Sequence, residues 1–213
     1  MYLPAHFEET RPEVLHALLR DHPLATWVVQ SGDGLLVNHI PFLLDATRGP
    51  HGTLIGHVAR ANPVWRQLGA SVAVFQGAQA YISPSWYPTK RAHGKVVPTW
   101  NYAVVHVHGA ARAIEPPDEV LAIVTRLTQT HEAASAVPWA VTDAPADYIE
   151  QMLKAIVGIE IPIERWVGKW KASQNRSAPD RLGTVAGLQQ RGDAQSLGVA
   201  ALVPTEEAPK APG

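Results

Sequence analysis

Hydroxyl, amide and aromatic side chains gather in two short stretches of the sequence, Tyr81–Tyr87 and Pro98–Tyr102. Aromatic rings offer surfaces on which a planar ligand can stack, and hydroxyls and amides fix the orientation of its polar edge. The two stretches therefore predict a binding site for a planar ligand with polar edges. The same residues could equally close one end of a barrel, with the hydroxyls bonding to exposed backbone groups.

A second group of polar residues lies where a strand is expected to end and a short helix to begin. Over Gly56–Pro63 the sequence places His57, Arg60 and Asn62 at this junction. An arginine fork binds phosphate oxygens through two parallel bonds, and the free N–H groups at a helix start add donors. The pattern fits a phosphate site, but an ordinary capped turn with a solvated arginine explains the spacing as well.

Two further stretches could carry chemistry. Gly168–Arg176 is basic and polar around one tryptophan, so it could reach a phosphate, pack against a barrel mouth, lie on DNA or simply connect a strand to a helix. His106 and His108 lie two residues apart on an expected strand and therefore face one side. A metal would need His39 or His57 as well, and no carboxylate is close in sequence, so no metal site is expected.

Several other chemistries lack the sequence patterns that they require. The 213 residues include no Cys, which excludes disulfides, a thiolate nucleophile, Cys-ligated zinc and iron–sulfur clusters. The sequence has no Gly-x-Ser-x-Gly, no Gly-x-Gly-x-x-Gly and no Gly-x-x-x-x-Gly-Lys. It therefore gives no support for a triad hydrolase or for nucleotide binding by a Rossmann or P-loop route.

The charge balance argues against a strongly basic nucleic-acid binder. Eighteen Lys and Arg face nineteen Asp and Glu, for a net charge of -1, so any DNA contact would need a local patch. No run of about 18 apolar residues occurs, and Met1–Glu9 lacks the basic start of a signal peptide. We therefore expect a soluble, cytoplasmic protein without membrane contact.

Mostly short strands are expected to position these groups. A capping box at Thr10–Glu13 predicts a first helix that His22-Pro23 ends. Few helices lie between the strands, which favours an antiparallel barrel over βαβ units. Ser31-Gly32-Asp33-Gly34 predicts a hairpin turn between the first two strands. Alternation and turn residues predict the strands Leu24–Gln30, Leu35–Leu44, Thr53–Ala59, Ser71–Gln76, Ala80–Ser83 and Tyr102–Ile114.

The second half of the chain is expected to be more helical. Apolar periodicity predicts helices over Pro117–His131, Asp143–Gly158 and Ser177–Leu188. Ile159–Glu164 alternates as a strand, and Pro162 favours a place at a sheet edge. We expect one domain over residues 1–191 and a disordered tail over residues 192–213, where no periodicity survives.

Six motifs occur in the order found in one known family. Each motif is modest by itself, but six in register are specific. With them the chain resembles the PaiB-like FMN-binding negative transcriptional regulators over about Met1 to Arg191. The motifs are Leu3-Pro4-x-His6-Phe7, Asn38-His39-Ile40-Pro41-Phe42, Gly56–Pro63, Tyr81–Tyr87, Val97–Tyr102 and Lys171-x-Ser173-Gln174-Asn175-Arg176.

The resemblance implies a mainly β, α+β fold: the FMN-binding split β-barrel with peripheral helices, similar to pyridoxamine-phosphate oxidases and flavin reductases. It implies FMN as the cofactor, a homodimer with two flavins at its interface, and negative transcriptional regulation. DNA as a partner is implied by the family name alone, because the chain has no recognisable helix-turn-helix and no basic run in its tail.

The motifs and the side-chain chemistry together assign the expected flavin contacts. His57, Arg60 and Asn62 suit the phosphate, and Asn38 and His39 could approach the ribityl chain or the ring edge. The residues expected to border the isoalloxazine are Ser83, Trp86, Tyr87, Thr99, Trp100 and Asn101.

Two alternative functions stay open on the sequence. The first is an FMN-dependent oxidoreductase using the same pocket, where the flavin does the hydride chemistry. Its catalytic residues are unassigned, with Tyr87 and His93 as the available proton donors, and whether the protein is an enzyme is undecided. The second is haem binding through His39, His57 or the 106/108 pair.

Overall fold

The computed structural model describes residues 1–205, and the chain groups into two compact units. Unit 1 comprises Met1–Arg11, Gln76–Val105 and the chain from Val167 onward. Unit 2 comprises Pro12–Phe75 and His106–Trp166. The expectation of one domain over residues 1–191 stays a prediction.

The first sheet of unit 2 contains the hairpin that the sequence predicts. Ser31 opposes Gly34 across the turn, and its Oγ accepts a hydrogen bond from the N–H of Asp33 and donates one to the carbonyl of Gly34. This side chain holds the tight turn that a strand pair needs. The strands, in spatial order, are the first part of β6 (Ala70–Ile82), β2 (Leu24–Ser31) and β3 (Gly34–Pro41).

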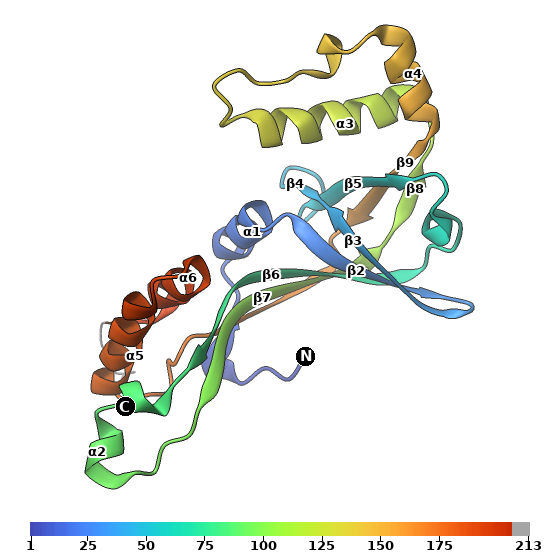
Figure 1. Ribbon diagram of the computed structural model, residues 1–213. Helices are drawn as coiled ribbons and strands as arrows, with labels where there is room; N and C mark the ends of the chain where they lie inside the picture. Colours follow the sequence, from blue (N-terminus) through green and yellow to red (C-terminus); the bar gives the residue numbers. More distant parts are fainter. Residues whose placement is uncertain (206–213) are drawn as a thin grey trace. The chain divides into compact units, whose positions relative to one another are not determined.

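The second sheet of unit 2 corrects one expectation. Its strands, in spatial order, are β4 (Leu43–Asp45), β5 (Thr53–Ala59), β9 (Ile156–Pro162) and β8 (Arg112–Ile114) (Figure 1). The edge position expected for β9 is wrong, because β9 pairs with β5 on one side and β8 on the other. Pro162 is tolerated because it is the last residue of the strand, where few ladder bonds are lost.

Helices cover apolar faces in unit 2. The first expected helix is confirmed as α1 (Pro12–Asp21), which buries Leu15, Leu18 and Leu19. In α3 (Pro117–Glu132), Ile123 and Leu127 pack with Leu43, Ile55 and Ile114 of the second sheet. The expected helix from Asp143 to Gly158 is shorter: after the 3₁₀ turn η4 (Val141–Asp143) it becomes α4 (Ala146–Lys154), and β9 begins at Ile156.

Unit 1 combines strands with two paired helices. Strands expected at Ser71–Gln76 and Ala80–Ser83 form one continuous strand, β6, and the last expected strand divides into β7 and β8. The strands, in spatial order, are β1 (Glu8–Glu9), β10 (Arg165–Lys171), β7 (Thr99–Ala110) and β6. The helical elements are the 3₁₀ turns η1 (Ala5–Phe7) and η3 (Pro84–Trp86), α2 (Thr89–His93), α5 (Ala178–Arg191) and α6 (Ala194–Leu202).

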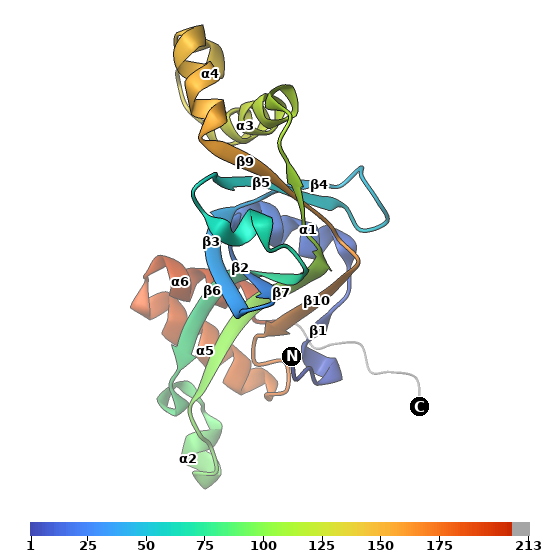
Figure 2. The ribbon, with the colours of Figure 1, turned by 90° about the vertical axis from the view of Figure 1, so that its right-hand side faces the viewer.

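The helix α6 corrects the expectation of disorder over residues 192–213, because it occupies Ala194–Leu202 and packs against α5 (Figure 2). Asp193 caps it by accepting hydrogen bonds from the N–H and the hydroxyl of Ser196. Val199 is fully buried, in a cluster with Leu188 of α5. The small residues of α6, which show no periodicity in the sequence, therefore serve close packing. Residues 206–213 of the expected tail lie outside the described part.

The strands pair antiparallel in β1–β10, β2–β3, β2–β6, β4–β5, β5–β9 and β8–β9. Helices and two sheets together agree with the expected α+β class. Within residues 1–205 no helix has the length and apolar composition needed to cross a membrane. The longest, α3, has 16 residues.

Candidate functional site

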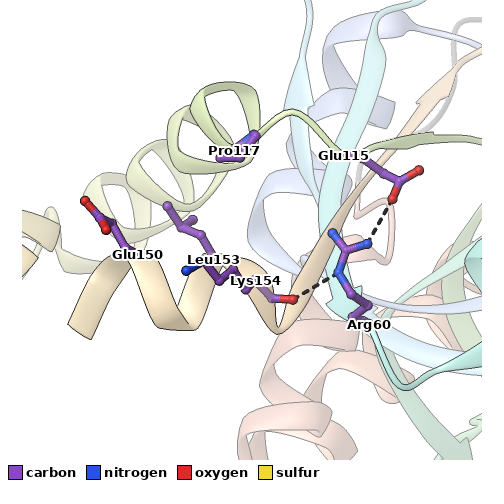
Figure 3. Close-up of a pocket in the computed structure, with 6 residues that line it drawn as sticks. All are labelled: Arg60, Glu115, Pro117, Glu150, Leu153 and Lys154. Carbon is purple, nitrogen blue, oxygen red and sulfur yellow. Dashed lines mark hydrogen bonds and ion pairs between the residues drawn. The ribbon is translucent and has the colours of Figure 1, made fainter. Parts of the chain in front are cut away.

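Arg60 lies in the wall of a cavity of about 620 Å³ in unit 2 (Figure 3). Its Nε donates to the carbonyl of Lys154 at 3.0 Å, and one terminal nitrogen donates to Glu115 Oε2 at 2.9 Å. The other terminal nitrogen donates to the carbonyl of Ile156 at 3.2 Å. All three guanidinium nitrogens are therefore bonded to the chain itself. The cavity is lined by Arg60, Glu115, Pro117, Glu150, Leu153 and Lys154.

The groups that Arg60 contacts are themselves negative. Glu115 contributes a carboxylate, and Lys154 is the last residue of α4, where the free carbonyls form the negative end of the helix dipole. A phosphate bound here would have to displace Glu115 from the guanidinium and would be repelled by it. The contacts that the structure shows tie α4 to the residue that follows β5, and the phosphate role of Arg60 stays a prediction.

Asn38 and Asn62, two more of the expected ligand contacts, bond to each other. Asn62 is the N-cap of the 3₁₀ turn η2 (Pro63–Arg66): its Oδ1 accepts from the N–H of Val64 at 3.0 Å. Its Nδ2 donates to Asn38 Oδ1 at 2.7 Å. His39 follows Asn38 on β3, so it points to the opposite face of the strand, where it is exposed. The structure thus joins the two asparagines and turns His39 away from them.

His57 is the expected site residue of unit 2 with an unused polar atom. It lies on β5 opposite Gly158 of β9. Its Nδ1 is buried and has no hydrogen-bond partner among residues 1–205. Burial lowers the pKa of His57, which favours the neutral imidazole, with one nitrogen as donor and the other as acceptor. The ring therefore keeps a hydrogen-bonding position that a ligand could use.

Ser83 and Trp86 have structural partners in unit 1. Ser83 is the N-cap of η3, and its Oγ accepts from the N–H of Ser85 at 3.2 Å. The indole of Trp86 packs on α5, and the guanidinium carbon of Arg191 lies 4.8 Å from its ring centre. These contacts set the course of the chain after β6, so both residues have a local role in the fold.

Tyr87 is almost wholly buried, with 2% of its surface exposed. Its hydroxyl makes no hydrogen bond within the described part of the chain, and the guanidinium carbon of Arg176 lies 5.0 Å from the ring centre. The pKa of Tyr87 is raised, mainly because its side chain is buried. The hydroxyl therefore stays protonated at neutral pH and can act as a hydrogen-bond donor.

Trp100 carries the most exposed of the expected stacking surfaces. Its side chain is 48% exposed, and its Nε1 donates to Gln79 Oε1 at 3.2 Å. Tyr81, 42% exposed, stands edge-on to it with ring centres 6.3 Å apart. The two rings form an aromatic surface at the end of β6 and the start of β7, suited to contact with a planar ligand.

Thr99 and Asn101 bond to the end of β10 and the turn that follows it. Lys171 Nζ donates to Thr99 Oγ1 at 2.5 Å and to the carbonyl of Trp100 at 2.8 Å. Asn101 Nδ2 donates to Ser173 Oγ at 2.9 Å, while Asn101 Oδ1 is buried and lacks a partner among residues 1–205. The sequence assigned no site role to Lys171 or Ser173, although both stand in the basic and polar stretch Gly168–Arg176 that it singled out.

The expected contacts fall into two groups, one in each unit. Unit 2 holds Asn38, His39, His57, Arg60 and Asn62, and unit 1 holds Ser83, Trp86, Tyr87, Thr99, Trp100 and Asn101. His106 and His108 are half-buried on one face of β7, and burial lowers the pKa of both. Within the described part no group of three metal-ligating side chains occurs.

Comparison with known proteins places the chain among flavin-binding proteins. Residues 1–165 match the model of the family described as "Putative FMN-binding domain". An uncharacterized protein of Aspergillus fumigatus is 34% identical, over 95% of this chain and 96% of its own. The protease synthase and sporulation protein PAI 2 of Bacillus subtilis is 32% identical, over 89% of each chain.

Solved structures agree on the fold. The FAD and heme binding protein from Mycobacterium smegmatis has a TM-score of 0.54 at 16% identity, covering 77% of this chain and 73% of its own. The flavocytochrome from Azotobacter vinelandii has a TM-score of 0.54 at 15% identity, covering 81% of this chain and 71% of its own. The expected split β-barrel is confirmed by these likenesses.

Proposed function

The chain belongs to the family of FMN-binding domains, and we propose that it is a homodimeric flavoprotein that acts as a negative transcriptional regulator. The family match over residues 1–165 carries the flavin part of this proposal. The regulatory part is supported by the relative of Bacillus subtilis, whose name connects it with protease synthesis and sporulation. Occupancy or redox state of the flavin would be the input to which the regulator responds.

The residues present fit a flavin nucleotide. FMN has a planar ring with polar edges, a chain of hydroxyls and a phosphate, so it needs aromatic surface, hydrogen-bonding groups and positive charge. Unit 1 offers the exposed rings of Tyr81 and Trp100, and the unpartnered Oδ1 of Asn101. Bound FMN would supply redox chemistry, and the protein would hold and orient it.

An absorbance spectrum of the protein purified without added cofactor, followed by titration with FMN, tests the flavin part. We expect flavin bands, and saturation at one FMN per chain. A protein that neither carries nor takes up FMN contradicts the proposal. The same spectrum detects haem by its Soret band, and light scattering on a sizing column gives the mass of the particle, which we expect to be that of a dimer.

A mobility-shift assay with the DNA that flanks the gene tests the regulatory part. Because the net charge is -1, we expect weak binding that falls further as salt is raised, and a preference for this DNA over a shuffled sequence of equal length. Equal binding of both DNAs, or none, contradicts direct regulation. Oxidation of NADH or NADPH by the FMN-loaded protein would instead point to an oxidoreductase.

A further inference from the structure

Three cations stand close together in unit 1 without a negative partner. Lys169 and Lys171 lie two residues apart on β10, so their side chains share a face of the strand, and Arg176 follows in the next turn. The ion pairs found among residues 1–205 include none of the three. Holding like charges together in this way costs free energy unless an anion neutralises them.

Uncharged groups hold these cations in place. Lys169 Nζ donates to the carbonyl of Tyr2 at 3.0 Å and lies 5.5 Å from the ring centre of Tyr102. Lys171 Nζ uses two of its three protons on Thr99 Oγ1 and the carbonyl of Trp100. The partners fix the positions of both ammonium groups but leave their charge uncompensated.

Neighbouring positive charges also affect the protonation of Lys171. Burial is the main cause that lowers the pKa of Lys171, and the positive charges of Lys169 and Arg176 lower it further. The guanidinium of Arg176 lies over the ring of Tyr87, with its carbon 5.0 Å from the ring centre, and forms no ion pair in the described part of the chain. A dianion would remove this repulsion and bind to N–H groups that are still available.

Asn101 supplies a second, independent observation beside this cluster. Its side chain is 1% exposed, and its Oδ1 has no partner among residues 1–205. Thr99 and Asn101 share one face of β7, and they bond to Lys171 and Ser173 respectively, so the amide lies next to the Lys171 contact. A buried carbonyl oxygen without a donor is costly, and a hydroxyl of a ligand would satisfy it.

The backbone at Ser173 fits the same picture. Ser173 has φ of 62°, the only non-glycine residue within the described part in the left-handed region. This conformation is unfavourable for a residue with a side chain. Asn101 donates to the hydroxyl of Ser173, and the turn ends with the N–H of Arg176 bonded to the carbonyl of Ser173 at 2.9 Å. The strained turn thus delivers Arg176 beside β10.

We propose that Lys171 and Arg176, supported by Lys169, bind the phosphate of a polyol phosphate, and that Asn101 Oδ1 accepts a hydrogen bond from one of its hydroxyls. The inference rests on the proposed function in that FMN, with its ribityl chain and terminal phosphate, is the ligand of this kind. It places the phosphate in unit 1 rather than on Arg60, whose nitrogens are bonded to Glu115 and to backbone carbonyls.

Titrations of the full chain with FMN and with riboflavin, which lacks the phosphate, test the proposal. Lys171→Met and Arg176→Gln each remove one charge, and Arg91→Gln removes an exposed charge on α2 as a matched control. We expect each of the first two to weaken FMN binding about tenfold or more and to leave riboflavin binding unchanged. Arg91→Gln should change the affinity for neither flavin. Arg176→Gln leaves the bonds of Lys171 intact, so it separates the phosphate effect from a folding defect.

The outcomes distinguish failure of the proposed phosphate site from failure of the proposed flavin binding. If both variants keep the preference of the wild type for FMN over riboflavin, the proposed phosphate site is wrong. If the wild type binds neither flavin, the proposed function fails, and calorimetry with ribitol 5-phosphate then decides the site by itself. If the wild type binds ribitol 5-phosphate and Arg176→Gln does not, the result supports a polyol phosphate site that serves another ligand. If the wild type does not bind ribitol 5-phosphate, the proposed site is overturned.

Discussion

Trp86 lies so close to Gly187 of α5 that a Cβ on the glycine would stand 2.2 Å from Cδ2 of the indole. No side chain can be accommodated there without moving a large, rigid ring. The absence of a side chain at position 187 therefore sets how closely η3 approaches α5 within unit 1, and with it the start of the segment that links β6 to β7.

Gly187→Ala should therefore destabilise the protein by about 1–3 kcal/mol, because overpacking forces the ring or the helix to shift. Gly32→Ala is the matched control: no atom lies within 4 Å of the Cβ that it would add, so its effect should stay within about 0.5 kcal/mol. Denaturant unfolding of both variants measures the difference. Equal stability of the two would show that the indole moves freely.

Buried neutral histidines should make the stability depend on pH. Burial lowers the pKa of His57 from 6.5, so the unfolded chain binds the proton more tightly than the folded one. The contribution of the neutral imidazole to the free energy of unfolding is present in full above pH 6.5. It is lost as the pH falls, with a slope of at most about 1.4 kcal/mol per pH unit for one group. His57→Gln should lose less stability between pH 7 and pH 5 than the wild type.

The matched control for this experiment is His39→Gln, which replaces an exposed imidazole. It should keep the pH dependence of the wild type. His106 and His108 have lowered pKa values as well, so part of the dependence should remain in His57→Gln. Urea unfolding at several pH values gives the free energies, and identical curves for the wild type and His57→Gln would exclude a buried neutral imidazole at this position.

The carboxylate of Glu160 on β9 is 2% exposed and pairs with Arg48 and with Arg112, whose Nη2 lies 2.6 Å from Oε2. The two arginines are 44% and 61% exposed, so water can solvate them when the carboxylate is gone. Glu160→Gln should therefore cost only about 1–2 kcal/mol. The double change Arg48→Met with Arg112→Met should cost more, about 3–5 kcal/mol, because it leaves a buried charge unpaired.

Thermal or denaturant unfolding of the wild type and of these variants measures the loss of stability in each. The reverse order, with Glu160→Gln the less stable, would mean that the carboxylate is better solvated than its burial indicates. Arg66→Met serves as a control for the loss of a surface arginine. Arg66 is exposed, and its guanidinium carbon lies 4.2 Å from the ring centre of Trp65.

Arg60→Ala separates the two places at which a flavin phosphate could bind. Its guanidinium holds the carbonyls of Lys154 and Ile156, so its loss should lower stability by about 1–3 kcal/mol. If the phosphate binds at Lys171 and Arg176, the FMN affinity of the folded variant should change less than about twofold. A loss of roughly 1–3 kcal/mol in FMN binding, with riboflavin unaffected, would return the phosphate to Arg60.

The local elements that the sequence predicts correctly depend on short-range interactions. The turn at Ser31–Gly34 and the first helix over α1 are stabilised by residues a few positions apart, so their patterns are visible in any window of the chain. The motifs likewise identify the flavin family without any tertiary contact. Type and spacing are enough for both conclusions.

What the sequence leaves undecided depends on residues far apart in the chain. Alternation at Ile159–Glu164 shows a strand but not its neighbours, and only pairing with both β5 and β8 makes β9 central and buries Glu160 between two arginines. The small residues of α6 show no helical stripe, because what they need is close approach to β6 and α5 rather than bulk.

The same distinction applies to the binding residues. The sequence by itself determined the family, the cofactor and the stretches that carry polar and aromatic groups. Only the tertiary structure decided which of these groups are already bonded to the chain, as Arg60 and Asn62 are, and which keep an unpartnered atom or charge, as Asn101 and Lys171 do. The physical reason is that a hydrogen bond or an ion pair uses up a binding group, and its partner can come from any point along the chain.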